Sequence, residues 1–213
     1  KYQSFLDSRP KKWENDAVAL MLSLAREAKA NGNDNKIHIV HLSSAEALKT
    51  IAEAKSQGLR FTAETCPHYL TISSEDIPDG KPLFKCCPPI REKSNREQLW
   101  QALKNGQISF IVSDHSPCTP QLKHLDTGDI EKAWGGISAL QFGLPLIWTE
   151  ALNRQMSLVD IVRLMSFETA KFAGLDKIKG QISVGYHADF VVFDDKSTFT
   201  INNEMIKHRH KIT

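Results

Sequence analysis

The sequence predicts an α/β fold built on a parallel sheet. Short runs of β-branched residues alternate with segments whose apolar residues recur at helical spacing. Neighbouring parallel strands need a long crossover, which is usually a helix, so this alternation is typical of a parallel sheet. The three predicted strands are IHIVHL at 37–42, LRFTAET at 59–65 and ISFIVSD at 108–114.

The helices that separate these strands are predicted from periodicity and from their end signals. A first helix over about 13–30 has apolar residues at helical spacing and stops at the N-G-N-D-N cluster of 31–35. Ser43 and Ser44 can cap a second helix, and Asn105-Gly106 ends a third. The predicted helices after the first are at about 45–57, 94–104, 137–153, 157–165 and 167–173.

Two long irregular stretches and a change in sequence pattern after Gly180 complete the predicted organisation. Residues 66–93 carry five prolines and are interpreted as a functional loop, and 115–135 is similarly irregular. After Gly180 the segment QISVGYHADFVVFD predicts short strands with a glycine turn and no crossover helix. We therefore predict one unit over 1–178 and a partial small β domain with a tail over 179–213.

Bulk composition argues against several classes of partner. The formal net charge is +2, and 41% of residues are hydrophobic, so neither a nucleic-acid partner nor a membrane partner is expected. No apolar stretch approaches about 18 residues. The four cysteines form no C-x-x-C pair, which indicates an intracellular, reducing setting without separating cytoplasm from organelle.

Three strand ends carry residues suited to chemistry. Strand 37–42 reaches His41, strand 59–65 is followed by T-C-P-H with His68, and strand 108–114 ends at Asp114. Functional groups of parallel α/β folds gather at the carboxyl ends of strands, so these side chains should converge. Two imidazoles and a carboxylate form a zinc-type ligand set, and Asp114 could also shuttle protons. The alternative is structural, because a single strand-end histidine is more often a packing residue.

The other histidines are expected to play lesser roles. His38 lies three residues before His41 and should face the opposite way on a strand. His115 should point away from its neighbour at 114 and take a supporting role. His208 and His210 form an H-x-H pair, but the basic tail KHRHK predicts a solvated segment rather than a metal site.

Several longer motifs, in order along the whole chain, resemble the cyclic amidohydrolases. The motifs are HLSSAEAL (41–48), TAETCPHYL (62–70), KCCPPIR (85–91), SDHSPC (113–118), KAWGGISALQ (132–141) and GQISVGYHADFVVFD (180–194). The resemblance implies a TIM-like (β/α)8 barrel of the metal-dependent hydrolase type, followed by a small composite β domain. It also implies that this chain carries only the second half of that barrel and only part of the β domain.

The same resemblance implies a site and its cofactors. Two divalent metal ions are expected, with zinc as the expected metal, and a carboxylated lysine is expected in the missing half of the barrel. His41 and His68 match ligands of one metal, and Asp114 matches a contact to the other metal and the catalytic proton shuttle. Cys87, Trp134 and Gly135 match segments that hydrogen-bond the substrate.

The implied function is hydrolysis of a small cyclic ureide or amide. The expected reaction opens allantoin to allantoate in purine catabolism, and the full-length protein is expected to form a homo-oligomer. The chain alone is expected to be inactive, since only half of the metal ligands are present. Two alternatives stay open: a substrate change to a dihydropyrimidine, hydantoin or dihydroorotate, and a catalytically silent scaffold relative.

Overall fold

A three-stranded parallel sheet forms the centre of the computed structural model, which describes residues 1–212. The strands are β1 (Ile37–Ile39), β2 (Phe61–Thr65) and β3 (Phe110–Ile111), in the order β1-β2-β3. Ile37 pairs with Phe61, and Thr65 pairs with Ile111. The predicted parallel α/β sheet is therefore confirmed.

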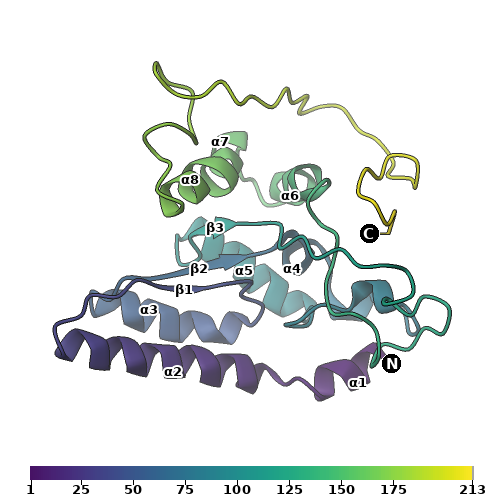
Figure 1. The fold of residues 1–213 in the computed structure, drawn as a ribbon, viewed down its shortest axis with the longest axis horizontal. Coiled ribbons are helices and arrows are strands. Elements are labelled where there is room, and N and C mark those ends of the chain that lie inside the picture. Colours follow the sequence, from purple (N-terminus) through teal and green to yellow (C-terminus); the bar gives the residue numbers. More distant parts are fainter. Residues whose placement is uncertain (213) are drawn as a thin grey trace.

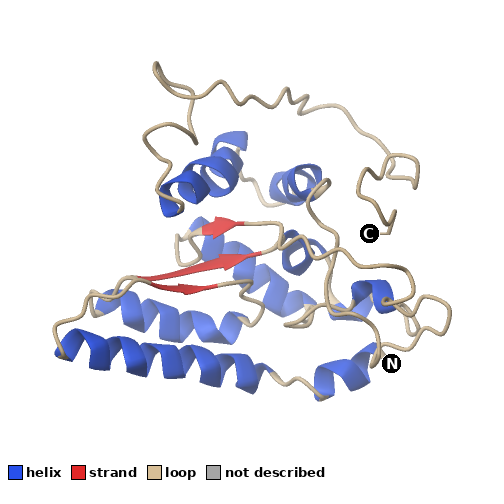
Figure 2. Cartoon of the chain, in the orientation of Figure 1, coloured by secondary structure: helices blue, strands red, loops and turns tan. Residues whose placement is uncertain are grey.

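Helices cover the sheet on both sides (Figure 1). α2 and α3 lie along the β1 side, and the helices after residue 143 lie beyond β3 (Figures 1 and 2). The α-helices are α1 (Tyr2–Asp7), α2 (Lys11–Ala30), α3 (Leu48–Ser56), α4 (Pro67–Thr71), α5 (Lys93–Lys104), α6 (Gly143–Leu152), α7 (Leu158–Val162) and α8 (Glu168–Phe172). Three 3-10 turns, η1 (Ala45–Ala47), η2 (Ser74–Asp76) and η3 (Pro82–Phe84), and one π-helical turn, η4 (Arg163–Phe167), complete the set.

Most predicted elements are present, with shifted bounds. α6 begins at Gly143, six residues later than predicted, and α4 with two 3-10 turns occupies part of the predicted loop 66–93. The strands are shorter than predicted, because β1 stops before His41 and β3 before Asp114. Both residues have a left-handed backbone, with φ of 40° and 43°, which a regular strand cannot accommodate.

The two faces of β2 differ in polarity. Phe61, Ala63 and Thr65 are buried, whereas Thr62 and Glu64 are half-buried on the other face. There they contact the His38 ring: Nδ1 lies 2.7 Å from Thr62 Oγ1, and Nε2 lies 3.0 Å from a Glu64 carboxylate oxygen. Both ring nitrogens of His38 therefore lie within hydrogen-bonding distance of side chains on β2.

The predicted strands within 181–194 are wrong. The described residues there form turns and irregular backbone, and Figure 2 draws the segment as loop. Most of its apolar residues are exposed, with Val184 and Val192 almost completely accessible. A strand needs a neighbour to receive its backbone hydrogen bonds, and none lies alongside this segment within 1–212. The division at residue 178 stays a prediction.

None of the described helices is a candidate for a membrane span. Across residues 1–212, no helix combines the length and the hydropathy needed to cross a bilayer. α2 is the longest helix, and it carries exposed charges beside its buried residues Val18, Leu22 and Ala25. It therefore has the amphipathic character of a helix packed on a sheet.

Candidate metal and substrate site

His41 lies just beyond β1 in a strained conformation. Its φ of 40° places a residue with a β-carbon in the left-handed region, at a cost of roughly 1–3 kcal/mol. The side chain is half-buried, and Nδ1 is buried without a hydrogen-bond partner among residues 1–212. Such a conformation persists only where the surroundings fix it, and it is enriched at functional sites.

Half-buried Glu14 and buried Asn95 fix the turn 42–45 that follows. The carboxylate of Glu14, from α2, accepts hydrogen bonds from the backbone N–H of Ser43 at 2.7 Å and of Ser44 at 3.0 Å. Asn95, from α5, donates to the Ser43 carbonyl at 2.8 Å and accepts from the Ala45 N–H at 2.9 Å. Burial raises the pKa of Glu14, and the two serine N–H groups oppose that rise. Helices on both sides thus hold the turn in place.

Asp114 occupies the corresponding position after β3. Its φ is 43°, and its side chain is exposed. Partial desolvation raises the pKa of Asp114, and the Glu64 charge adds to the rise while His41 opposes it. A carboxylate of raised pKa is a better proton acceptor than an ordinary aspartate, which suits a proton-transfer role.

Cys66, His68 and Asp114 come together at one point. Each offers one ligand atom, and these atoms all lie within 4.8 Å of one another. Pro67 begins α4 directly after β2, so Cys66 and His68 sit at the junction of strand and helix. Cys66 is completely buried, and the sequence pattern did not single it out among the four cysteines. The available signal was its place immediately after a strand.

His68 is buried and lacks a partner. The residue is 3% exposed, and neither ring nitrogen has a hydrogen-bond partner within the described chain. Burial lowers the pKa of His68 to about 3, with further lowering from His41 and Lys123. His41 also acts electrostatically on Asp114, but it is not among the residues whose ligand atoms lie within 4.8 Å of one another, so the structure brings together two of the three predicted residues.

This donor set fits a divalent metal ion. Imidazole nitrogen, carboxylate oxygen and thiol sulfur are all zinc ligands, and a buried imidazole with no hydrogen bond is suited to a metal. Among residues 1–212, no buried lysine directs its ammonium group to this cluster. Lys85 and Lys123, the two buried lysines, direct their ammonium groups to backbone carbonyls.

The segments around Cys87 and Trp134 contact each other. A β-carbon added to Gly135 would lie 3.0 Å from the Cys87 sulfur, and one added to Gly136 would lie 2.4 Å from the Ser116 hydroxyl oxygen. That hydroxyl accepts a hydrogen bond from the Trp134 indole at 3.3 Å. A side chain at position 135 would press on the Cys87 sulfur, and one at position 136 would overlap Ser116, so both glycines permit close packing.

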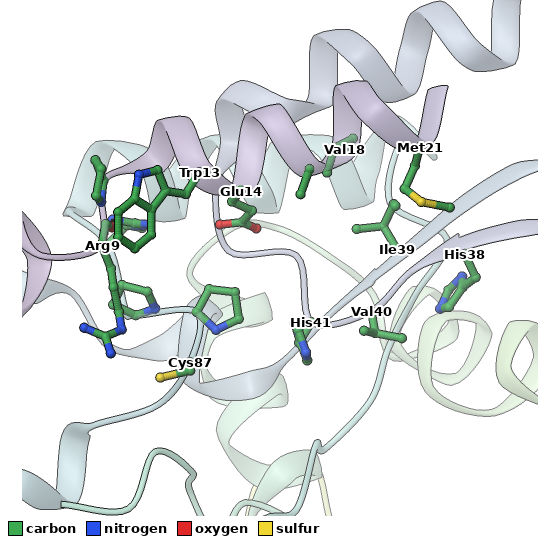
Figure 3. A pocket seen from close by; sticks show the side chains of 15 residues that line it. Arg9, Trp13, Glu14, Val18, Met21, His38, Ile39, Val40, His41 and Cys87 are labelled. Atoms are coloured by element: carbon green, nitrogen blue, oxygen red, sulfur yellow. Dashed lines mark hydrogen bonds between the residues drawn. The ribbon is translucent and has the colours of Figure 1, made fainter. Parts of the chain in front are cut away.

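Cys87 also shares a pocket with His41 (Figure 3). The pocket has a volume of about 540 Å³ and lies between α2 and β1. In Figure 3, Trp13 and Glu14 extend from α2, and His41 and Cys87 lie across the view from that helix. One cavity therefore connects a predicted metal ligand with a predicted substrate-binding residue.

His208 differs from its prediction. Its ring is partly buried against His115, with ring centroids 5.8 Å apart, and neither of its nitrogens has a partner in residues 1–212. Burial lowers the pKa of His208, and His115 contributes. The Gln141 side chain holds the tail here: its amide N–H donates to the Met205 carbonyl, and its amide oxygen accepts from the Lys207 N–H. The prediction that His208 lies in a solvated tail is therefore wrong.

Comparison with known proteins places these features in context. The model of the amidohydrolase family matches residues 20–209. An allantoinase of Streptomyces avermitilis is 50% identical over 213 residues, covering 100% of this chain and 46% of the relative. An allantoinase of Saccharomyces cerevisiae is 49% identical over 212 residues, covering 100% and 45%.

Solved structures agree on the fold. The dihydropyrimidinase of Brevibacillus agri superposes with a TM-score of 0.83 at 33% identity, covering 95% of this chain and 43% of that chain. The predicted fold class, part of a TIM-type α/β barrel, is confirmed. The chain spans less than half the length of the relatives it matches.

Replacing Asn95 with alanine tests the bonds that hold the turn 42–45. The substitution removes two buried hydrogen bonds and leaves a buried N–H and C=O unsatisfied. We expect a loss of roughly 2–4 kcal/mol in the free energy of unfolding, measured by urea denaturation. Asn33→Ala, on an exposed loop, is the matched control and should cost under about 0.5 kcal/mol. Equal effects of the two substitutions would contradict the role given to Asn95.

Lowering the pH tests the environment of His68 in chelator-treated protein. Its folded pKa of about 3 lies below the usual 6.5, so the unfolded chain binds the proton more readily. Its contribution to stability is therefore fully present above about pH 6.5 and declines as the pH falls towards 3. We expect unfolding free energies of wild type to fall more steeply than those of His68→Gln over this range. Parallel curves would show that burial does not disfavour the imidazolium.

Proposed function

The chain belongs to the amidohydrolase family, and from this premise we propose that the protein carrying it hydrolyses the ring of a cyclic amide. Allantoin is the proposed substrate and allantoate the product, in purine catabolism. The support for this substrate is the roughly 50% identity, over the whole chain, to two relatives named allantoinase.

One observation carries the proposal at the chemical level. The ligand atoms of Cys66, His68 and Asp114 lie within 4.8 Å of one another at the carboxyl end of the sheet, and His41 is electrostatically coupled to that group. Sites of hydrolysis in parallel α/β folds lie at this end of the strands. A binding or scaffold protein would have no need to leave buried imidazole nitrogens without partners there.

We propose His41, His68 and Asp114 as metal ligands, with Cys66 beside them. Two divalent ions, with zinc as the proposed metal, and a carboxylated lysine from outside this chain would complete the centre. Such an ion, when bound, polarises the ring carbonyl and lowers the pKa of an attacking water. The strained turn at His41, fixed by Glu14 and its neighbours, would hold the imidazole in place for that ion.

Asp114 is the proposed proton shuttle. Water adds to the ring carbonyl, its proton passes to the Asp114 carboxylate, and the carboxyl group then donates that proton to the ring nitrogen. The carbon–nitrogen bond breaks as the protonated nitrogen leaves, so the charge balances over the step. The raised pKa of Asp114 supports this role, because the carboxyl group must both accept and release a proton near neutral pH.

The substrate ring is proposed to bind where Cys87 meets Trp134 and Gly135. Cys87 lines the same pocket as His41, so a ring held at Cys87 would lie beside one of the proposed metal ligands. Trp134 is 47% exposed and offers an aromatic surface beside the segment. We further propose an intracellular location, since all four cysteines are free thiols, and a homo-oligomer for the full-length protein.

A second substrate class has a specific observation in its favour. The similarity to a solved dihydropyrimidinase extends over 95% of the chain. A panel of allantoin, hydantoin, dihydrouracil and dihydroorotate, assayed with full-length protein, separates the two candidates. We expect the highest kcat/KM for allantoin. A higher value for another ring would change the substrate, and no turnover of any ring by metal-loaded protein would remove the hydrolase proposal.

Replacing Asp114 with asparagine tests the proton shuttle. The amide cannot accept the proton, so kcat should fall by about 1,000-fold or more while the far-UV circular dichroism spectrum is unchanged. Asp126→Asn, on an exposed loop of the same region, is the control and should retain wild-type kcat. A kcat within about tenfold of wild type in Asp114→Asn would exclude this residue as the shuttle.

Metal content separates the two proposed histidine ligands. His41→Asn and His68→Gln, purified as full-length proteins, should each contain less metal than wild type, with affinity reduced by about tenfold or more. Inductively coupled plasma mass spectrometry measures the content, and His187→Asn is the exposed control. If only one of the two variants loses metal, the other histidine has a packing role.

A further inference from the structure

Lys123 is a buried lysine whose charge is fully satisfied by main-chain carbonyls. The residue is 2% exposed. Its ammonium group donates to the carbonyls of Lys85 at 2.9 Å, Trp134 at 3.0 Å and Gly136 at 2.5 Å. An ammonium group has three protons, so each one has an acceptor. A buried charge is costly unless it is paired in this way, which makes the position demanding.

The three carbonyls belong to the two segments proposed to bind substrate. Lys85 lies two residues before Cys87, and the other two carbonyls flank Gly135 on either side. The Gly136 N–H also donates to the Lys85 carbonyl at 2.9 Å. The ammonium group therefore sits at the junction of these segments and holds them together.

This arrangement determines the direction of the Gly135 peptide groups. The Trp134 carbonyl of one peptide is bound by Lys123, and the Gly136 N–H of the other donates to the Lys85 carbonyl, whereas neither the N–H nor the C=O of Gly135 is hydrogen-bonded anywhere in residues 1–212. A free N–H beside a free C=O is complementary to the edge of a cyclic amide, which presents one acceptor and one donor. The Cys87 sulfur packs directly against Gly135, so the gap between the segments is narrow.

We propose that Lys123 is a positioning residue, which holds the Cys87 segment against Gly135 and so sets the affinity of the site for a cyclic amide. The proposal rests on the function proposed above, because it assumes that this junction receives the substrate. Lys123 acts through the backbone it binds and does not take part in the reaction.

Burial lowers the pKa of Lys123 to about 8. At neutral pH the ammonium form therefore still predominates, and all three protons remain available as donors. The other buried lysine, Lys85, donates instead to the single carbonyl of Glu131, which lies outside the Gly135 segment. The triple contact is thus particular to Lys123 and to this junction.

The test compares Lys123→Met, Lys123→Arg and the exposed control Lys171→Met in full-length, metal-loaded protein. Methionine keeps the apolar length of the side chain but has no donor. We expect Lys123→Met to raise KM for allantoin by about tenfold or more, with kcat within about threefold of wild type. Lys123→Arg should restore much of the KM, since guanidinium keeps the charge and the donors.

A second readout does not depend on turnover. Cys87 is exposed, whereas the other three cysteines are buried, so iodoacetamide should alkylate Cys87 selectively. Separation of the segments in Lys123→Met should speed this alkylation by about fivefold, measured by peptide mapping, while Lys171→Met reacts at the wild-type rate. If wild type hydrolyses no cyclic amide, the proposed function fails, but the alkylation rates still test the role of Lys123.

Two results would overturn the proposal. One is a folded Lys123→Met with wild-type KM and wild-type Cys87 reactivity. The other is an equal loss of kcat and of melting temperature in Lys123→Met and Lys123→Arg, which would mark a purely structural lysine. If Lys123→Met does not fold, Lys123→Leu is measured by the same criteria, because leucine also lacks a donor.

Discussion

The left-handed turn at His41 is the constraint on which the site depends. A histidine in this conformation is unfavourable in isolation, and the buried hydrogen bonds of Glu14 and Asn95 compensate for it. Because these two side chains come from α2 and α5, the turn forms only when both helices are packed on the sheet. Asp114 has a similar backbone φ beyond β3, so a left-handed residue follows each of these two strands.

The distribution of satisfied and unsatisfied polar groups separates scaffold from site. The side chains that hold the turns and loops, such as Asn95 and Lys123, are hydrogen-bonded to backbone groups. The buried nitrogens without partners among residues 1–212 lie mainly on histidines, including His41 and His68. Since buried polar groups are rarely left without partners, this contrast marks the histidines as groups suited to a ligand. The side chains that stabilise the turns and loops thus have hydrogen-bonding partners, whereas the histidine nitrogens are free to bind a ligand.

Sequence patterns and tertiary packing contributed differently to the elements. The parallel sheet follows from strand and helix periodicities, and helix α2 lies close to its predicted bounds. The strand ends could not be read from the sequence, because the apolar run continues past the point where β1 stops. The segment 181–194 shows the opposite case, since its alternating pattern favours strands but no neighbouring strand lies beside it in residues 1–212. A strand is stabilised by its partner, and a local pattern cannot supply one.

The features of the site also divide into those that the sequence predicted and those that only the structure revealed. The sequence alone determined the residue types at the strand ends, because parallel topology places the carboxyl ends of strands at one edge, and so it singled out His41, His68 and Asp114. Only the tertiary structure decided that Cys66 joins His68 and Asp114, that His208 packs against His115, and that Lys123 lies at the junction of two distant loops. These contacts join residues far apart in the chain through long loops, whose paths depend on packing and carry no periodic signal. Periodicity reports what a residue does for its own element, whereas contacts between elements exist only once the chain has folded.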